Sequence, residues 1–317
     1  MGKKIPTLTG EIDVSELGYT LTHEHYVSLD WSMRIAFPQL FEADIFCERA
    51  EYLIKKAMEN GLTTIVDLTC INNGRDVELM KRISERTGLQ TVFSTGLYFN
   101  EEPWVPGRPA EFIADLFIQE LTEGVQGTGI RPGVIKCATD KYGFSEINKT
   151  ILKATGIAAS ETKVPVFTHT VAAMKHGLQQ QELLEQEGVD LRRVVIGHVG
   201  DTNDLDYVEE LMKRGSFVGL DRFGSEGGLT DEERINNLLK LIEHGYIHQI
   251  LISHDYPLFY DWGSNNWQIE KSIPVEKVRV GFSYIPGRIV PELRKRGLSQ
   301  AEIDILMIEN PRRLFEI

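Results

Sequence analysis

An eightfold alternation of two kinds of segment constrains the fold of this chain more than any other feature of its sequence. Each repeat begins with a short apolar run rich in Val, Ile, Thr and Phe and continues into a longer segment with helical spacing. Most of the runs are apolar almost without interruption, as strands covered on both faces should be. The predicted strands are 20–27, 63–69, 90–98, 133–139, 165–171, 193–200, 217–224 and 249–256.

The segments between these strands have one apolar face and one charged face, which predicts amphipathic helices. The predicted helices are 44–60, 76–87, 110–123, 146–161, 178–187, 205–214, 231–244 and 286–296. No linker rich in Pro, Gly or Ser divides the eight alternations, so they fit a (β/α)8 barrel better than two doubly wound domains. We therefore expect an α/β fold, with a single TIM barrel domain over residues 1–317.

Three segments lie outside the repeating pattern. Residues 3–18 are expected to form a short hairpin that closes the barrel floor. Long loops rich in aromatic residues follow the first and the eighth strand, where short connections are the rule. Both loops leave the carboxyl ends of strands, the face on which barrel enzymes build their substrate pockets, although an irregular structural lid is the alternative.

Composition and charge limit the possible partners. The sequence holds 34 Lys and Arg against 47 Asp and Glu, a formal net charge of −13, which repels nucleic acid and anionic membranes and favours small neutral or cationic substrates. No apolar stretch approaches the roughly 18 residues of a membrane-spanning helix. The three cysteines form no C-x-x-C pair, and the first ten residues lack a secretion signal. We expect a cytoplasmic protein.

The sharpest local signal is the sequence Thr22-His23-Glu24-His25 in the first predicted strand. Residues two apart on a strand face the same way, so the two imidazoles converge while Glu24 turns to the opposite side. Such a pair is typical of metal sites, but H-x-H also occurs by chance.

Further polar residues fall near the ends of later strands, on the face where barrel active sites lie. Each of them taken singly is also compatible with a buried structural role, but their joint placement is hard to explain that way. These residues are Lys136, His169, His198 and Asp255.

Lys136 needs a chemical reason, because a protonated ammonium cannot bind a metal ion and is costly to bury unpaired. If burial and nearby cations lower its pKa, the neutral amine can add carbon dioxide and become a carbamate, which can bridge two ions. The residues then predict a site for two metals. One ion takes His23, His25 and Asp255, the other takes His169 and His198, and Lys136 spans both with a hydroxide.

The order of these residues along the strands resembles the phosphotriesterase branch of the amidohydrolase superfamily. The resemblance extends to sequence motifs along essentially the whole chain and is most specific for the phosphotriesterase-like lactonases. These motifs are THEH, GRD at 74–76, TGLY at 95–98, IKCATD, VPVFTHT, IGHVGDT, GLDRFG, SHDYP, DWG at 261–263 and NPRRLF.

The resemblance implies a binuclear metal hydrolase whose bridging hydroxide attacks a lactone carbonyl, with weaker hydrolysis of organophosphate triesters. Asp255 would accept the proton. Tyr98 would orient or polarise the carbonyl, and Arg222, typical of the lactonases, would join a charge network with Asp201 and Asp255 behind the metal ligands. Packing for Tyr98 and a loop salt bridge for Arg222 are the alternatives.

The substrate is less constrained than the chemistry. We expect Phe99, Tyr256 and Trp262 to bind an apolar acyl or alkyl group, as in N-acyl homoserine lactones or γ- and δ-lactones, although these aromatics could equally stabilise the loop or a dimer. Other readings are a hydrolase of phosphorylated sugar lactones, using cations such as Arg108 or Lys277, a dedicated phosphotriesterase, or a metal-binding barrel without turnover. Zinc is expected, with manganese, cobalt or iron as alternatives; the resemblance also implies a homodimer.

Overall fold

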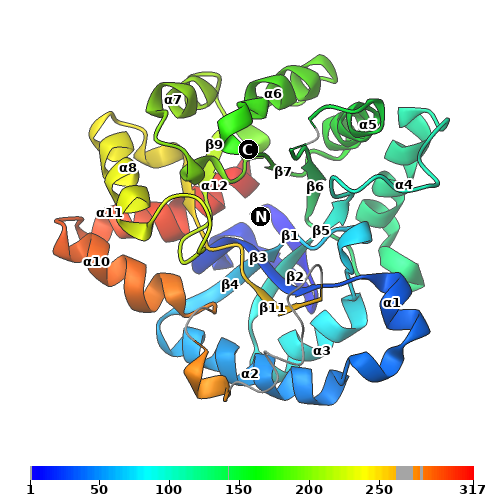
Figure 1. Cartoon of the computed structure of the whole chain (residues 1–317), viewed down its shortest axis with the longest axis horizontal. Helices are drawn as coiled ribbons and strands as arrows, with labels where there is room; N and C mark the ends of the chain where they lie inside the picture. The colour runs from blue at the N-terminus through cyan, green and yellow to red at the C-terminus, as the bar shows by residue number, and fades with distance from the viewer. Residues whose placement is uncertain (1, 142, 262–273, 279–280) are drawn as a thin grey trace.

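The computed structural model describes residues 2–141, 143–261, 274–278 and 281–317. Its centre is a ring of parallel strands surrounded by helices, which confirms the expected (β/α)8 barrel (Figure 1). Successive barrel strands pair with one another in chain order. They are β3 (Tyr19–Ser28), β4 (Leu62–Asp67), β5 (Gln90–Gly96), β6 (Val134–Ala138), β7 (Val166–His169), β8 (Val194–Ile196), β9 (Phe217–Leu220) and β10 (Ile250–Ile252).

The helices that cover the ring agree with the predicted ranges to within about two residues, apart from the last. Side-chain caps fix several of their first turns: Asp76 accepts from the backbone N–H of Leu79, and Thr230 forms a capping box with Glu233. The helices are α2 (Ala43–Glu59), α3 (Val77–Thr87), α4 (Ala110–Glu123), α5 (Glu146–Thr162), α6 (His176–Gln186), α7 (Leu205–Lys213) and α8 (Asp231–Glu243).

The predicted helix 286–296 begins with a π-helical turn, Ile285–Ile289, and continues as α10 (Val290–Lys295). Two further helices, α11 (Gln300–Asp304) and α12 (Asn310–Glu316), lie beyond the predicted repeats. The long connection after β3 holds the short helix α1 (Trp31–Ala36). None of the helices in the described ranges has the length and apolar character needed to cross a membrane.

The predicted eighth strand, 249–256, is split in the structure. After β10 the chain bends through residues 253–256 and then forms β11 (Pro257–Tyr260), which pairs in parallel with β3 and so closes the ring. Asp255 within the bend has a φ of 53°, which lies in the left-handed region that residues other than glycine rarely occupy. The bend places Asp255 at the carboxyl end of the barrel.

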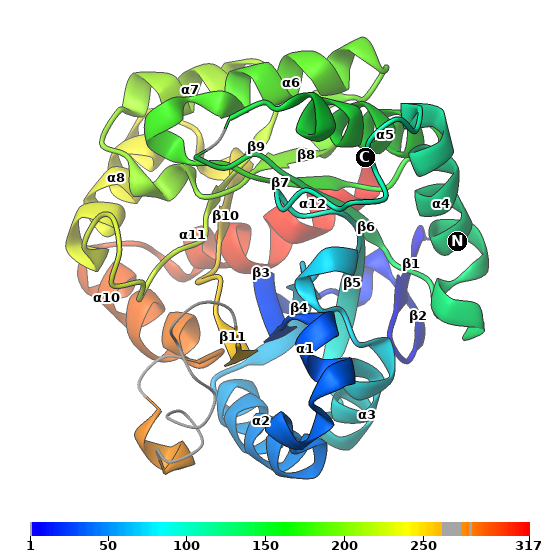
Figure 2. The same ribbon diagram turned by 45° about the vertical axis from the view of Figure 1, so that its right-hand side comes forward.

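The opposite end of the barrel is filled by the expected hairpin, formed by β1 (Lys4–Thr7) and β2 (Gly10–Asp13) (Figure 2). Ile5, Val14 and Leu17 from this segment are almost fully buried, together with Leu314 and Phe315 of α12. They pack in one cluster with inward-facing strand residues: Val66, Leu68, Val92, Val134, Phe167, Val195, Phe217 and Leu251. Because this core fills the amino end of the barrel, a site in the barrel can open only at the carboxyl end.

Candidate metal centre

The six predicted metal ligands meet at the carboxyl end of the barrel. The Nζ atom of Lys136, in β6, lies 3.0 Å from Nε2 of His23, in β3. The Oδ1 atom of Asp255 lies 3.0 Å from Nε2 of His25 and 3.4 Å from Nε2 of His23. On the far side, Nε2 of His198 lies 3.9 Å from Oδ2 of Asp255, and the ring centroids of His198 and His169 are 4.5 Å apart.

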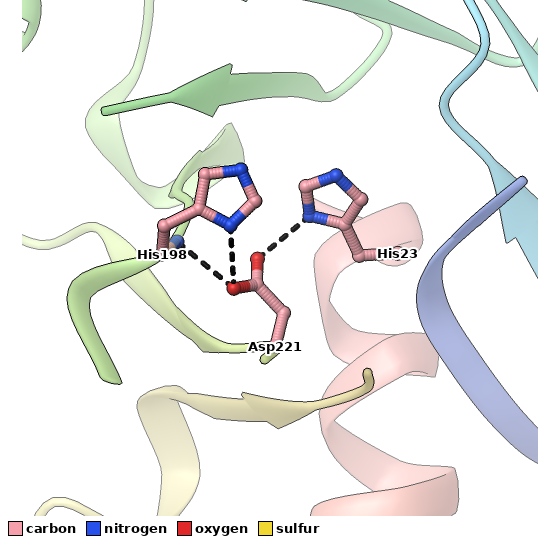
Figure 3. Close-up of side chains that lie close together, drawn as sticks. All are labelled: His23, His198 and Asp221. Atoms are coloured by element: carbon pink, nitrogen blue, oxygen red, sulfur yellow. Dashed lines mark hydrogen bonds and ion pairs between the residues drawn. The ribbon is translucent and has the colours of Figure 1, made fainter. Parts of the chain in front are cut away.

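Asp221, one residue beyond β9, holds two of these imidazoles at once (Figure 3). Its Oδ2 atom lies 2.6 Å from Nδ1 of His23, and its Oδ1 atom lies 2.9 Å from Nδ1 of His198. Oδ1 also accepts a hydrogen bond of 2.9 Å from the backbone N–H of His198, a residue with a φ of 63°. The carboxylate thus fixes the rotation of both rings and leaves each Nε2 facing the centre.

The other two imidazoles are anchored in the same way by different groups. Nδ1 of His25 lies 2.9 Å from Oγ1 of Thr69, which in turn donates to the backbone carbonyl of Val27. Nε2 of His169 lies 2.9 Å from Oδ2 of Asp140, so His169 presents Nδ1 toward the centre rather than Nε2. In each of the four rings one nitrogen is thus held by an anchoring side chain, and the other nitrogen of His23, His25 and His169 contacts Lys136, Asp255 and the Tyr98 hydroxyl, respectively.

This arrangement fits divalent metal ions. A histidine that binds a metal characteristically uses its second ring nitrogen to contact a carboxylate, carbonyl or hydroxyl, which fixes its tautomer. Among the residues that the structure describes, two sets of side chains each bring their potential ligand atoms within 4.8 Å of one another: one is His23, His25 and Asp255, and the other is His23, His198 and Asp221. In the second group Asp221 contacts the Nδ1 atoms, so we assign it the anchoring position and not that of a ligand.

The electrostatics of the centre favour the protonation states that metal binding needs. Burial lowers the pKa values of His23, His198 and Lys136, and it lowers that of His169 to about 4. Each of these shifts favours the neutral form of its group, which is the form that binds a metal ion. For Asp255, burial opposes ionisation, but the neighbouring imidazoles of His23 and His198 hold the pKa of its carboxyl well below the usual value.

Lys136 is 1% exposed, and the carboxylates of Asp255 and Asp221 raise its pKa by less than burial lowers it. Its Nζ atom contacts an imidazole, and within the described part of the chain no ion pair joins it to a carboxylate. An unpaired ammonium in such a place is costly. The position therefore suits the neutral amine, or a derivative of it that carries a negative charge between metal ions.

Arg222 lies at the rim of the centre and contacts two carboxylates. Its Nε atom donates to Oδ2 of Asp255 over 3.4 Å, and Nη1 donates to Oδ2 of Asp201 over 3.3 Å. Asp201 is also held by Arg234, whose side chain is 1% exposed and donates to Oδ1 of Asp201 over 2.7 Å. The predicted charge network is thus present in the geometry, with Arg234 as an additional member.

The aromatic side chains expected near a substrate are placed differently from one another. The hydroxyl of Tyr98 lies 3.2 Å from Nδ1 of His169, and the ring of Phe99 packs against Tyr98 with centroids 4.6 Å apart. Phe99 also lines a cavity of about 400 Å³ together with Asp140. The ring of Tyr256 stacks on that of His254, with the ring centroids 5.7 Å apart. Trp262 lies outside the described residues.

Two carboxylates that matter in this geometry, Asp221 and Asp140, were not among the predicted site residues. Both follow barrel strands directly or within two residues, so the strand-end argument that selected Asp255 applies to them too. The spacing of residues along one sequence, however, does not indicate which ring nitrogen a carboxylate will meet.

Comparison with known proteins identifies the family of the chain. The sequence model of the family described as "Phosphotriesterase family" matches residues 3–315 of this chain. An aryldialkylphosphatase of Saccharolobus solfataricus is 37% identical over 306 residues, 96% of each chain. A phosphotriesterase homology protein of Mycobacterium tuberculosis is 34% identical over 323 residues, 99% of this chain and 98% of that protein. An N-acetyltaurine hydrolase of Danio rerio is 26% identical over 356 residues, 98% and 97% of the two chains. The protein therefore belongs to the phosphotriesterase family of hydrolases.

Proposed function

We propose that the protein is a binuclear metal-dependent lactonase, which opens N-acyl homoserine lactones or γ- and δ-lactones and hydrolyses organophosphate triesters more slowly. The observation that carries this proposal is the inward orientation of four anchored imidazoles around Lys136 and Asp255. His23, His25 and Asp255 would hold one ion, and His169 and His198 the other. Lys136, as a carbamate, would bridge them.

Bound divalent ions would supply Lewis acidity toward the carbonyl or phosphoryl oxygen and lower the pKa of a water molecule. The two carboxylate oxygens of Asp255 would then have different roles. Oδ1 faces His23 and His25 and suits metal binding, whereas Oδ2, which Arg222 keeps oriented, would be the oxygen left to accept a proton. Arg222 keeps this oxygen oriented by its hydrogen bond, and Asp201 holds the guanidinium from the other side.

Preference for a lactone rests on Tyr98 and Phe99. A phenol O–H near Nδ1 of His169 can donate to the carbonyl oxygen of an ester that reaches the centre, where charge develops in the transition state. The ring of Phe99 and the adjoining cavity offer apolar surface for the rest of the substrate. Roles of Tyr256 and Trp262 in binding the acyl chain remain predictions.

A panel of substrates tests the proposal. Protein reconstituted with Zn²⁺ should release protons rapidly from an N-acyl homoserine lactone or an unsubstituted δ-lactone, and slowly from a phosphate triester. If neither lactone is hydrolysed, the lactonase proposal is contradicted. In that case turnover of a phosphorylated sugar lactone, of a triester alone, or of N-acetyltaurine would identify the activity instead, the last because one relative is a hydrolase of that compound.

We also propose that the protein is cytoplasmic and that two copies of the chain form a homodimer. Support for an interface comes from α1 and the residues after it, where Met33, Ile35 and Phe37 are 45%, 75% and 46% exposed. Light scattering after size exclusion should give twice the chain mass of 35.9 kDa. A mass of one chain at micromolar concentration would contradict the dimer.

A further inference from the structure

Glu24 lies between His23 and His25 in β3 and is fully buried, with its side chain turned away from the metal centre. Its Oε1 atom accepts hydrogen bonds from Oγ of Ser253 (2.7 Å), from the backbone N–H of His254 (3.2 Å) and from Nδ1 of His254 (2.5 Å). Its Oε2 atom accepts from the backbone N–H of Tyr256 (3.2 Å). All four donors belong to one short segment, 253–256.

That segment is the break between β10 and β11. The backbone N–H of Asp255 donates to the carbonyl of His23 over 3.1 Å, as a strand neighbour would. The backbone N–H groups of the two neighbours of Asp255, His254 and Tyr256, donate to the carboxylate of Glu24 and not to carbonyls of a strand. A buried N–H without an acceptor is costly, so the side chain of Glu24 makes the break possible.

The break in turn determines where Asp255 points. With a φ of 53°, Asp255 is in a conformation that persists only when its surroundings impose it. Its two neighbours are held by Glu24, and its carboxylate reaches His25, His23 and Arg222. Ser253 adds a second connection, because its Oγ also accepts from the backbone N–H of His23 over 3.0 Å.

We propose that Glu24 is a positioning residue, which holds the left-handed turn at Asp255 and so aims that carboxylate at the metal centre. The inference rests on the proposed function, since Asp255 is taken there as a metal ligand. Glu24 itself does not reach the centre. Its carboxylate is satisfied by four donors of the chain and acts only through the turn.

The test replaces Glu24 by glutamine, which has the same shape. Whichever way the amide is turned, its NH2 faces at least one N–H or O–H donor, so the turn loses an acceptor and gains a repulsive contact. Loss of a residue that orients a metal ligand typically weakens metal binding by about 10–100-fold. We expect a loss of that size for one of the two ions, measured by Zn²⁺ titration against a chromophoric chelator, and a change in the visible absorption bands of the Co²⁺-loaded protein.

Asn310→Ala is the matched control. Asn310 is fully buried, and its Nδ2 clamps the other end of the same strand by donating to the carbonyls of Ile247 (2.7 Å) and Ile250 (2.8 Å). Its loss should lower the melting temperature and leave Zn²⁺ affinity and the Co²⁺ spectrum unchanged. If Asn310→Ala weakens metal binding as much as Glu24→Gln, the effect is one of general stability and the proposal is overturned.

A double-mutant cycle completes the test. In an Asp255→Ala background, Glu24→Gln should weaken Zn²⁺ binding much less than it does alone, because the main effect of Glu24 passes through Asp255 and only the contact of Ser253 with the backbone N–H of His23 remains. Wild-type affinity in the single variant, or an undiminished loss in the Asp255→Ala background, would refute the role of Glu24. If Glu24→Gln does not fold, Glu24→Asp keeps the charge, shortens the reach and carries the same expectations. Failure of the wild-type protein to bind any Zn²⁺ would instead contradict the proposed function.

Discussion

Replacing Asp221 by asparagine should disrupt the metal centre without removing a metal ligand. The carboxylate is 2% exposed and accepts from Nδ1 of His23 over 2.6 Å and from Nδ1 of His198 over 2.9 Å. Asparagine has a single oxygen, so only one of the two rings can keep its anchor. The other ring then faces an NH2 group, which favours the tautomer with the proton on Nε2, the nitrogen that should bind the ion.

The expected loss can be stated from two directions. Removal of an anchor of this kind lowers metal affinity by about 10–100-fold, which corresponds to about 1.4–2.8 kcal/mol. A hydrogen bond to a charged group contributes about 1.5–3 kcal/mol, so loss of one such bond gives the same range. We therefore expect at least one ion to bind about 10–100-fold more weakly in Asp221→Asn.

Metal-free protein titrated with Zn²⁺ in competition with a chromophoric chelator measures this directly, with circular dichroism to confirm that the variant is folded. Glu120→Gln provides the control, since it also removes a carboxylate that contacts a buried partner but lies on α4, outside the barrel. The anchoring role of Asp221 is refuted if Asp221→Asn binds both ions with wild-type affinity, or if Glu120→Gln loses as much affinity.

Three further predictions concern stability and the active residues. Glu120→Gln leaves the guanidinium of Arg75, which is 4% exposed and held by two hydrogen bonds of 2.6 and 2.7 Å, without its anion; denaturant unfolding should show a loss of about 3 kcal/mol, and a change below 1 kcal/mol would contradict this. Tyr98→Phe should lower kcat for a lactone by about 10²-fold with unchanged Zn²⁺ content, and an unchanged kcat would remove Tyr98 from the reaction. Lys136→Ala should lose the second ion and nearly all activity, as metal analysis and proton release would show, whereas retained activity would exclude a bridging role.

The sequence was sufficient to predict the barrel, because an apolar run followed by an amphipathic segment is repeated eight times. Each apolar run forms a strand in the ring, and the helices begin near residues such as Asp76 and Thr230 that cap them. The gathering of the six predicted ligands followed from the barrel itself, since the carboxyl ends of its strands share one face. The errors of the prediction concern the ends of strands. The predicted strand 193–200, for example, is only three residues long in the structure, because the chain turns at His198 with a φ of 63°.

Other parts of the site depend on contacts between distant residues and could not be predicted from local pattern. The split of the eighth strand depends on Glu24, about 230 residues earlier, which accepts the N–H groups of the break. The helices α11 and α12 lie beyond the eight repeats on which the prediction rested, although their buried residues recur at helical spacing across the π-helical connection. The choice of Nδ1 as the inward atom of His169 depends on Asp140, which only the folded chain brings within 2.9 Å.

We propose that this centre holds two metal ions that together open a lactone. The most direct test of this proposal is a titration of metal-free protein with Zn²⁺ in bicarbonate buffer, with bound metal and proton release from an N-acyl homoserine lactone measured at each step. The rate should rise until two ions are bound per chain and then stay constant. Full activity with one ion bound, or no lactone hydrolysis with two, would contradict it.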